Sequence, residues 1–237
     1  MTGKPTEDPI PNPNPNPNPD PNPDPNHHQA HAHPRRFSPT QAHRLDAPER
    51  RLWLPVEPVL EQMALAPGMT VADIGAGTGF FTLPIAHAVG PVGHVTAVDV
   101  SPEMLALLNQ KILAANLPNI DCISAESAST GLAPESFDRV LLANVWHEID
   151  DRAATLAEAA RLLRPGGRIA ILDWSPDLPD PLPNVRPDPV PGPPLAHRIP
   201  LLDAQHELVE HGWHLTFADP IGRYSWLLLA ARPGTRS

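Results

Sequence analysis

Short β-branched runs alternate with helical patterns through the middle of this chain. The expected strands are residues 70–74, 94–98, 119–123, 137–143 and 168–174. The stretches between them include FFTLPIAHAVG, SPEMLALLNQKILAANL and DRAATLAEAARLLRPGG, whose apolar residues recur every three or four positions. Ser101 before Pro102 is typical of a helix start, and Gly166 is expected to close the third helix. Strict alternation predicts a parallel sheet with right-handed crossovers and helices on both faces.

The C-terminal part departs from this alternation. A helical pattern, LLDAQHELVEHG, is followed by two strand patterns, HLTFADP and RYSWLLLAAR, with only Ile221 and Gly222 between them. So short a connection predicts an antiparallel hairpin at one end of the sheet. The expected fold is therefore α/β and Rossmann-like, with a mostly parallel seven-stranded sheet, helices on both faces and an antiparallel C-terminal hairpin.

Proline is concentrated in two irregular segments. The chain has 34 prolines in 237 residues, and PNPNPNPNPDPNPDPN forms part of residues 1–36, a Pro/Asn/His-rich tail that we expect to be disordered. A second Pro-rich stretch, 175–199, lies between strong periodic signals and is expected to be a loop over a binding site. Residues 37–66 are predicted to form a helical cover, and residues 67–233 one catalytic domain.

Charge and cysteine content exclude several classes of protein. Seventeen Lys and Arg against 27 Asp and Glu give a net charge of −10, which disfavours nucleic acid as a partner. Cys122 is the only cysteine, so intramolecular disulfides and cysteine-based zinc sites are excluded, and no metal is expected. No apolar run is long enough to span a bilayer, so we expect a cytoplasmic protein without stable membrane insertion. No particular oligomeric state is predicted.

A glycine-rich turn follows the first strand. Asp73 precedes Gly75-Ala76-Gly77-Thr78-Gly79, which lets the backbone approach a ligand at a helix start. The nicotinamide fingerprint G-x-G-x-x-G fails because position 80 is Phe80. Two further acids, Asp99 and Glu126, follow the second and third strands, where open α/β sheets bind ligands. Acidic lining suits a positively charged nucleoside such as S-adenosylmethionine.

The motifs together resemble those of class I S-adenosylmethionine-dependent methyltransferases, of the branch near the ubiquinone/menaquinone-biosynthesis enzymes. VADIGAGTGFFT is similar to the first motif of that family, VTAVDVSPEML to the second, and ISAESAST with ESFDRVLLANVWHEI to the third and fourth; LLRPGGRIAILDW is similar to the segment leading into the fifth strand. The resemblance runs from Leu45 to about Pro233. It implies S-adenosylmethionine as cofactor and a small molecule as methyl acceptor.

The resemblance also implies roles for individual positions. It assigns to the cofactor the residues Asp73, Gly75, Ala76 and Gly77 for the methionine part, Asp99 for the ribose, Val100 and Met104 for the adenine ring, Glu126 with Ser127 for the adenine amino group, and Asn144 at the methionine end. The longer side chain of Glu126 stands where the family usually has aspartate. Asn144 is expected to face the acceptor side.

Proton transfer and acceptor binding are assigned to three other residues. His147 is the expected general base because an unperturbed imidazole suits proton abstraction near neutrality. His197 and Arg198 are expected to contact the acceptor from the Pro-rich loop; a structural role for Arg198 beside Asp203 is the alternative. His147 and Glu148 could equally be the histidine and capping acid of a helix start. For the whole chain, a non-catalytic S-adenosylmethionine- or nucleoside-binding module and an NAD-linked oxidoreductase remain alternatives.

Overall fold

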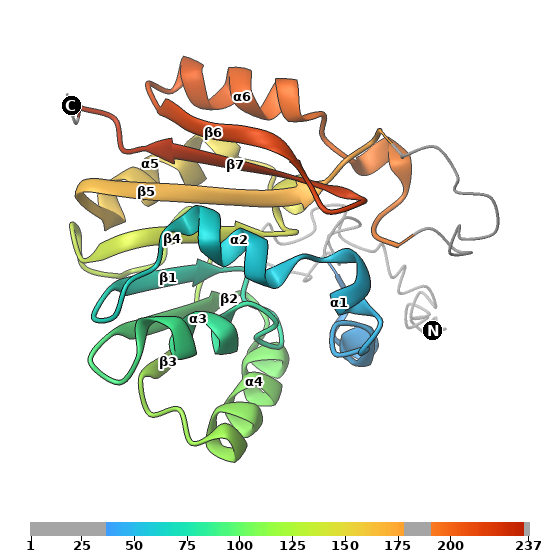
Figure 1. Ribbon diagram of the computed structural model, residues 1–237, viewed down its shortest axis with the longest axis vertical. Coiled ribbons are helices and arrows are strands. Elements are labelled where there is room, and N and C mark those ends of the chain that lie inside the picture. The colour runs from blue at the N-terminus through green and yellow to red at the C-terminus, as the bar shows by residue number, and fades with distance from the viewer. Residues whose placement is uncertain (1–36, 178–190, 235–237) are drawn as a thin grey trace, which may run out of the picture. The chain divides into compact units, whose positions relative to one another are not determined.

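A computed structural model describes residues 37–177 and 191–234 (Figure 1). The Pro/Asn/His-rich tail, residues 1–36, and the middle of the Pro-rich loop, residues 178–190, lie outside the described residues. The expectations of a disordered tail and of a loop over the site therefore remain predictions.

Seven strands form one sheet in the order β3-β2-β1-β4-β5-β7-β6. The strands are β1 (Thr70–Ile74), β2 (His94–Asp99), β3 (Ile120–Ser124), β4 (Phe137–Ala143), β5 (Leu163–Trp174), β6 (His214–Ile221) and β7 (Ser225–Ala231). Strands β3, β2, β1, β4 and β5 are parallel, whereas β7 pairs antiparallel with both β5 and β6. The predicted seven-stranded, mostly parallel sheet with its C-terminal hairpin is confirmed.

Helices cover both faces of the sheet, as expected. They are η1 (Pro39–Arg44), α1 (Arg50–Trp53), α2 (Val56–Met63), α3 (Thr82–Val89), α4 (Pro102–Ala115), η2 (Trp146–Glu148), α5 (Arg152–Leu162), η3 (Leu195–His197) and α6 (Leu201–Glu210), where η marks a 3-10 helix. Apolar side chains of α2, α3 and α4 share one hydrophobic core, and those of α5 and α6 share another. The alternate residues of β1 divide between the two cores, Val71 entering the first and Ala72 the second.

The start of α4 is fixed by a side-chain cap, as the sequence predicts. Ser101 has extended backbone, its Oγ accepts a hydrogen bond from the amide of Met104 at 3.2 Å, and Pro102 occupies the first helical turn. This cap places the beginning of α4 directly after the carboxyl end of β2. The residues that follow Asp99 are therefore held at the edge of the sheet where ligands bind in this architecture.

Two sequence-based boundaries are wrong. Gly166 does not close the third helix: α5 ends at Leu162, and Gly166, at φ 82°, lies inside β5. The strand begins early because Leu163 pairs with Phe137, ahead of an irregularity in the β4 ladder. The hairpin turn is also longer than expected, since Ile221 pairs with Ser225 and belongs to β6.

The strand order reverses between β1 and β4, because β2 and β3 lie on one side of β1 and β4 lies on the other. In open α/β sheets this switch point opens a crevice at the carboxyl ends of the strands. The glycine-rich turn after β1 and the segment after β4 therefore meet at the same edge. Among the residues described, no helix combines the length and apolar character that crossing a bilayer requires.

Candidate cofactor and acceptor site

The glycine-rich turn crosses from β1 towards β2. The amides of Gly75 and Ala76 both donate to the carbonyl of Val98, at 2.7 and 3.0 Å. Gly75 has φ 75°, and a Cβ placed on it would lie 2.4 Å from Cγ1 of Val145, just beyond β4. A side chain at this position would therefore be strained and would collide with its neighbour. Glycine allows the turn to lie against the residues that follow β4.

Asp73 lies under this turn, at the end of β1. Its carboxylate is 1% exposed and accepts a hydrogen bond of 2.6 Å from Oγ1 of Thr82, at the start of α3. Burial raises the pKa of Asp73 to about 6, the Thr82 hydrogen bond opposes this, and the nearby Asp99 carboxylate adds to it. In this structure Asp73 joins β1 to α3 beneath the turn.

The raised pKa of Asp73 predicts a pH-dependent cost in stability. The pKa moves from 3.8 to about 6 on folding, so between these values the folded state binds more protons than the unfolded state. The free energy of unfolding therefore falls as pH rises through this window. Asp73→Asn keeps an oxygen for Thr82 but removes the charge. The free energy of unfolding of Asp73→Asn minus that of the wild type should therefore increase from pH 4 to pH 7, by at most about 3 kcal/mol.

This difference is measured by urea unfolding of the cofactor-free chain at both pH values. Asp121→Asn is the matched control, because the Asp121 side chain is 71% exposed. A stability difference for Asp73→Asn that is the same at pH 4 and pH 7 would show that burial does not raise this pKa.

Asp99 connects the glycine turn to the start of α4. Its Oδ2 accepts from the amide of Gly77 at 2.8 Å, and its Oδ1 accepts from the amide of Ser101 at 2.9 Å. A carboxylate offers about four acceptor positions, so these two bonds are compatible with bonds to ribose hydroxyls. Asp99 is therefore positioned at the carboxyl end of β2 by the same backbone segments that shape the crevice.

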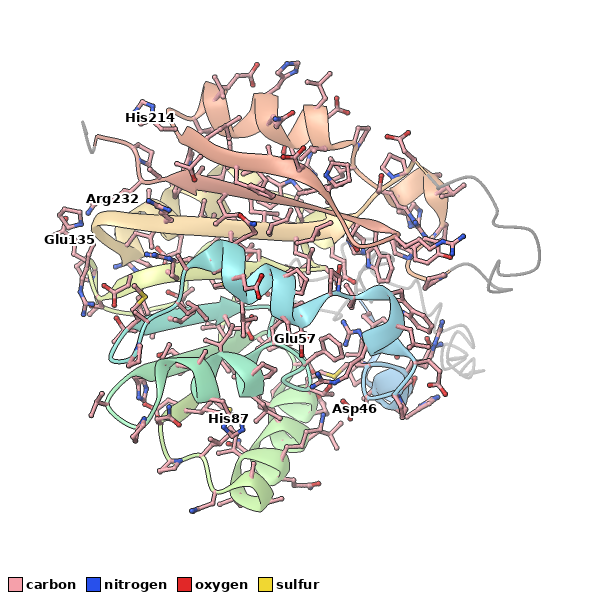
Figure 2. The ribbon with its side chains drawn as sticks, in the orientation of Figure 1. Asp46, Glu57, His87, Glu135, His214 and Arg232 are labelled. Atoms are coloured by element: carbon pink, nitrogen blue, oxygen red, sulfur yellow. The ribbon has the colours of Figure 1, made fainter. Side chains whose placement is uncertain are left out.

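The segment before α2 contacts the glycine turn from outside. Asp46 accepts a hydrogen bond of 2.7 Å from Oγ1 of Thr78 and forms an ion pair with Nζ of Lys111, on α4. The guanidinium of Arg50 lies 4.3 Å from the ring centroid of Phe80. Figure 2 shows Asp46 beside α4, on the opposite side of the picture from the labelled Arg232. Asp46 and Arg50 thus contact the turn and the residue that follows it, and the role of residues 37–66 as a cover remains a prediction.

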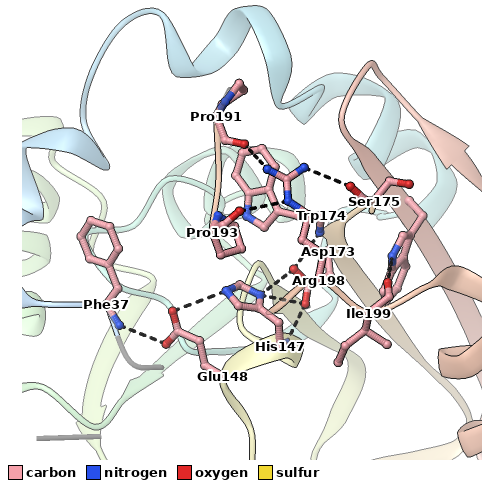
Figure 3. A network of polar contacts seen from close by, with 11 residues as sticks. Phe37, His147, Glu148, Asp173, Trp174, Ser175, Pro191, Pro193, Arg198 and Ile199 are labelled. Carbon is pink, nitrogen blue, oxygen red and sulfur yellow. Dashed lines mark hydrogen bonds and ion pairs between the residues drawn. The ribbon is translucent and has the colours of Figure 1, made fainter. Parts of the chain in front are cut away.

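A buried histidine and aspartate meet at the carboxyl ends of β4 and β5 (Figure 3). Nδ1 of His147 lies 2.8 Å from Oδ1 of Asp173, and the amide of His147 donates to Oδ2 at 2.8 Å. The amide of Trp174 also donates to Oδ1, at 2.7 Å. The side chains of His147 and Asp173 are 6% and 0% exposed. Burial lowers the pKa of His147, but Asp173 and Glu148 outweigh it and hold that pKa above its usual value.

Glu148 lies on the other side of the same imidazole. Its Oε1 is 3.7 Å from Nε2 of His147, and its Oε2 accepts a hydrogen bond of 3.3 Å from the amide of Phe37 (Figure 3). Burial raises the pKa of Glu148 to about 7; His147 and the Phe37 amide oppose this, whereas Asp173 and Asp99 add to it. One imidazole thus lies between two carboxylates, and the outer carboxylate contacts the cover.

Asp173 is the residue of this cluster that the sequence analysis missed. It lies near the end of the stretch RIAILDW, and the four residues directly before it, 169–172, are apolar and buried. A single acid at the end of a buried strand needs a partner, because an unpaired buried carboxylate is costly. That signal was available in the sequence, but it does not say which residue the partner is.

Comparison with known proteins shows that the chain is similar to methyltransferases. Residues 72–171 match the family described as "Methyltransferase domain". The crystal structure of a SAM-dependent methyltransferase from Aquifex aeolicus superposes with a TM-score of 0.75 and 27% identity, over 83% of this chain and 100% of that one. Residues 72–171 are therefore a methyltransferase domain, and the chain is similar to class I S-adenosylmethionine-dependent methyltransferases.

Two curated relatives are similar over part of their length. An arsenite methyltransferase of Halobacterium salinarum is 36% identical over 110 residues, which are 46% of this chain and 28% of that protein. A demethylmenaquinone methyltransferase of Listeria monocytogenes is 32% identical over 121 residues, or 51% of each chain. This chain therefore spans about half or less of the length of these relatives. The methyltransferase resembles the ubiquinone/menaquinone-biosynthesis type, and the cofactor of its family is S-adenosylmethionine.

The site of the methyltransferase fits that cofactor in two respects. The carboxyls of Asp73 and Glu148 both have pKa values raised in part by Asp99, so negative charge is concentrated here and favours a cationic ligand. The side-chain amide of Asn144 is buried, and neither its Oδ1 nor its Nδ2 has a partner among the described residues. Asn144 also has φ 59°, rare for a residue other than glycine. A strained backbone and buried polar atoms without hydrogen-bond partners are typical of functional positions.

The four residues assigned to the adenine end differ in their surroundings. Val100 is 39% exposed and Met104 is buried. Glu126 is exposed and forms an isolated bridge with Ser129, while Oγ of Ser127 lies 3.0 Å from Oγ1 of Thr155 on α5. Their contacts with adenine remain predictions.

Arg198 has a structural role in this structure, which was the alternative expectation, but its partners are loop carbonyls and not the expected carboxylate. Its guanidinium is buried and donates to three loop carbonyls, those of Ser175, Pro191 and Pro193, at 3.0, 2.5 and 3.1 Å (Figure 3). These bonds join the two described ends of the Pro-rich loop, and no described contact pairs Arg198 with Asp203. His197 is exposed. Contact of either residue with an acceptor remains a prediction. To contact an acceptor, Arg198 would have to give up its hydrogen bond to one of these carbonyls.

Metal binding finds no support in residues 37–177 and 191–234. Within them, no group of three or more His, Cys, Asp or Glu side chains is arranged to hold a metal ion. Cys122 has its thiol pKa raised by burial and by Asp121, which disfavours the thiolate.

Proposed function

We propose that this protein transfers a methyl group from S-adenosylmethionine to a small-molecule acceptor. The observation that carries the proposal is Asp99, which joins the glycine turn and the start of α4 at the carboxyl edge of a methyltransferase domain. A carboxylate at that point suits the ribose of a nucleoside. The acidic surroundings suit a ligand with a sulfonium and an ammonium group.

Residues on the first two strands would hold the cofactor. Gly75, Ala76 and Gly77 would follow its methionine part, Asp99 its ribose, and Met104 its adenine. When bound, S-adenosylmethionine supplies a methyl group on a positively charged sulfur. The chain itself aligns the acceptor with that methyl group and excludes water, and such positioning accounts for much of the acceleration of a displacement reaction.

The Asp173–His147–Glu148 cluster would handle the acceptor's proton. It combines an imidazole with two carboxylates, at the edge of the sheet where β4 and β5 end. His147 thus remains part of the proposed site, with Asp173 fixing the orientation of its ring. Asn144, with its unpartnered buried amide, is proposed to contact the bound molecules.

The acceptor's identity does not transfer from the relatives, since arsenite and demethylmenaquinone are chemically unlike. One cysteine in the whole chain excludes an arsenic site built from several thiols. The net charge of −10 argues against nucleic acid. A cytoplasmic location is proposed on the absence of an apolar run long enough to span a bilayer.

Calorimetric titration of the full chain distinguishes the proposal from an NAD-linked reductase. S-adenosylmethionine should bind with one site per chain, and NADH should not bind. Phe80 occupies the position of the third glycine of the nicotinamide fingerprint and lies under the Arg50 guanidinium. Binding of NADH in preference to S-adenosylmethionine would refute the assignment.

A further inference from the structure

His147 is poorly placed to accept a proton. Nδ1 is bonded to Asp173, Nε2 faces Glu148, and the side chain is 6% exposed. An imidazole between two carboxylates is stabilised in its doubly protonated form, which has no lone pair to offer. The raised pKa of His147 has the same cause. A general base must be unprotonated when its substrate arrives, so His147 is the wrong member of the cluster for that step.

Glu148 is better placed. Its side chain is 19% exposed, against 0% for Asp173, and it is bonded to the amide of Phe37 in the cover. Asp99, the carboxylate at the carboxyl end of β2, contributes to its electrostatic surroundings. Glu148 therefore contacts His147 on one side and the backbone of Phe37 on the other. Of the three ionisable groups, it has the most exposed side chain and is the one that an acceptor can reach most readily.

We propose that Glu148 accepts the proton of the methyl acceptor, and that His147 is a positioning residue held by Asp173. The proposal rests on the methyltransferase function proposed above. The Glu148 carboxylate takes the proton as the acceptor atom's electron pair forms the bond to the methyl carbon. The bond from that carbon to sulfur breaks, and its electron pair neutralises the sulfonium. The proton then leaves Glu148 for solvent.

The charges around Glu148 tune it for this step. The imidazolium of His147 and the Phe37 amide favour its ionised form, whereas burial, Asp173 and Asp99 favour its protonated form; Arg198 acts on the cluster through His147, whose protonation it opposes. The resulting pKa of about 7 makes Glu148 a stronger base than an ordinary glutamate, while it remains partly ionised at neutral pH.

The activity test uses methyl-labelled S-adenosylmethionine with a deproteinised extract of the source cells, across a range of pH. Wild-type incorporation should rise with pH through about 7. Glu148→Gln should lower it by at least about 10²-fold and remove that rise, while Glu148→Asp should restore part of it. His147→Gln should keep the rise but move it to higher pH, because the cation that favours ionised Glu148 is gone. Glu210→Gln, exposed on α6, is the control.

A second readout does not depend on turnover. Infrared difference spectra of the cofactor-free chain, wild type minus Glu148→Gln, should show a carboxyl that titrates near neutrality. Titration near the ordinary glutamate value of about 4.3 would overturn the proposal. So would Glu148→Gln incorporation within threefold of wild type, or loss of the pH-dependent rise in His147→Gln alone. If the folded wild type binds S-adenosylmethionine but transfers no label, the proposed function itself fails. Melting temperatures identify a variant that has not folded.

Discussion

Asp173→Ala is expected to lower the free energy of unfolding by about 3–5 kcal/mol, the scale for removing one partner of a buried ion pair. The Asp173 carboxylate is fully buried and accepts from the amides of His147 and Trp174 as well as from the imidazole. Its removal leaves two backbone donors without partners in the core, each costing about 1–3 kcal/mol. The total loss should be smaller than the sum of the ion-pair and hydrogen-bond costs, because the structure relaxes in part and the protonation of His147 changes.

Urea unfolding at pH 7 measures this loss. Asp121→Ala is the matched control. The Asp121 side chain is 71% exposed and pairs with His94 on β2, so its removal should change stability by no more than about 0.5 kcal/mol. Equal stability changes in the two variants would mean that Asp173 does not hold the ends of β4 and β5 together.

Asp99→Ala is expected to weaken S-adenosylmethionine binding by about ten- to over a hundredfold. Loss of hydrogen bonds between ribose hydroxyls and a charged acceptor costs about 1.5–3 kcal/mol, which by itself corresponds to this range. The structure adds a second cause, because Asp99 also holds the amides of Gly77 and Ser101. The variant should therefore lose both a ligand contact and the order of the turn.

Isothermal titration calorimetry measures the affinity of this variant. Asp99→Asn separates the two causes, because the asparagine side chain has no charge but retains one acceptor oxygen for the turn. Asp99→Asn should therefore lose less affinity for S-adenosylmethionine than Asp99→Ala does. Unchanged affinity in Asp99→Ala would remove this residue from the cofactor site. Asp121→Ala, at the edge of the neighbouring strand β3, should bind the cofactor as the wild type does.

The arrangement of the sheet could be predicted because it depends on local patterns. Apolar β-branched runs specify buried strands, and their alternation with amphipathic helices allows few topologies. The cap at Ser101 was predictable for the same reason, since it involves residues three apart. The end of the third helix was not. Gly166 looks like a helix stop in sequence, but pairing of Leu163 with β4 ends the helix earlier.

In the candidate site, too, the features that depend on local sequence could be predicted and those that depend on distant contacts could not. The glycine turn and Asp99 follow strands at fixed spacing, so their proximity follows from topology. The His147–Asp173 pair joins residues 26 apart, on separate elements, and nothing local specifies their contact. Arg198 could not be placed either, because its partners are backbone carbonyls of a loop, which carry no sequence signal.

The most direct test of methyl transfer is the formation of S-adenosylhomocysteine by the purified full chain, supplied with S-adenosylmethionine and a deproteinised cell extract. The wild type should form S-adenosylhomocysteine only when extract is present, and Asp99→Ala should form it more slowly at low cofactor concentration. Tight cofactor binding with no S-adenosylhomocysteine at any extract concentration would contradict the proposed activity and identify a non-catalytic binding module.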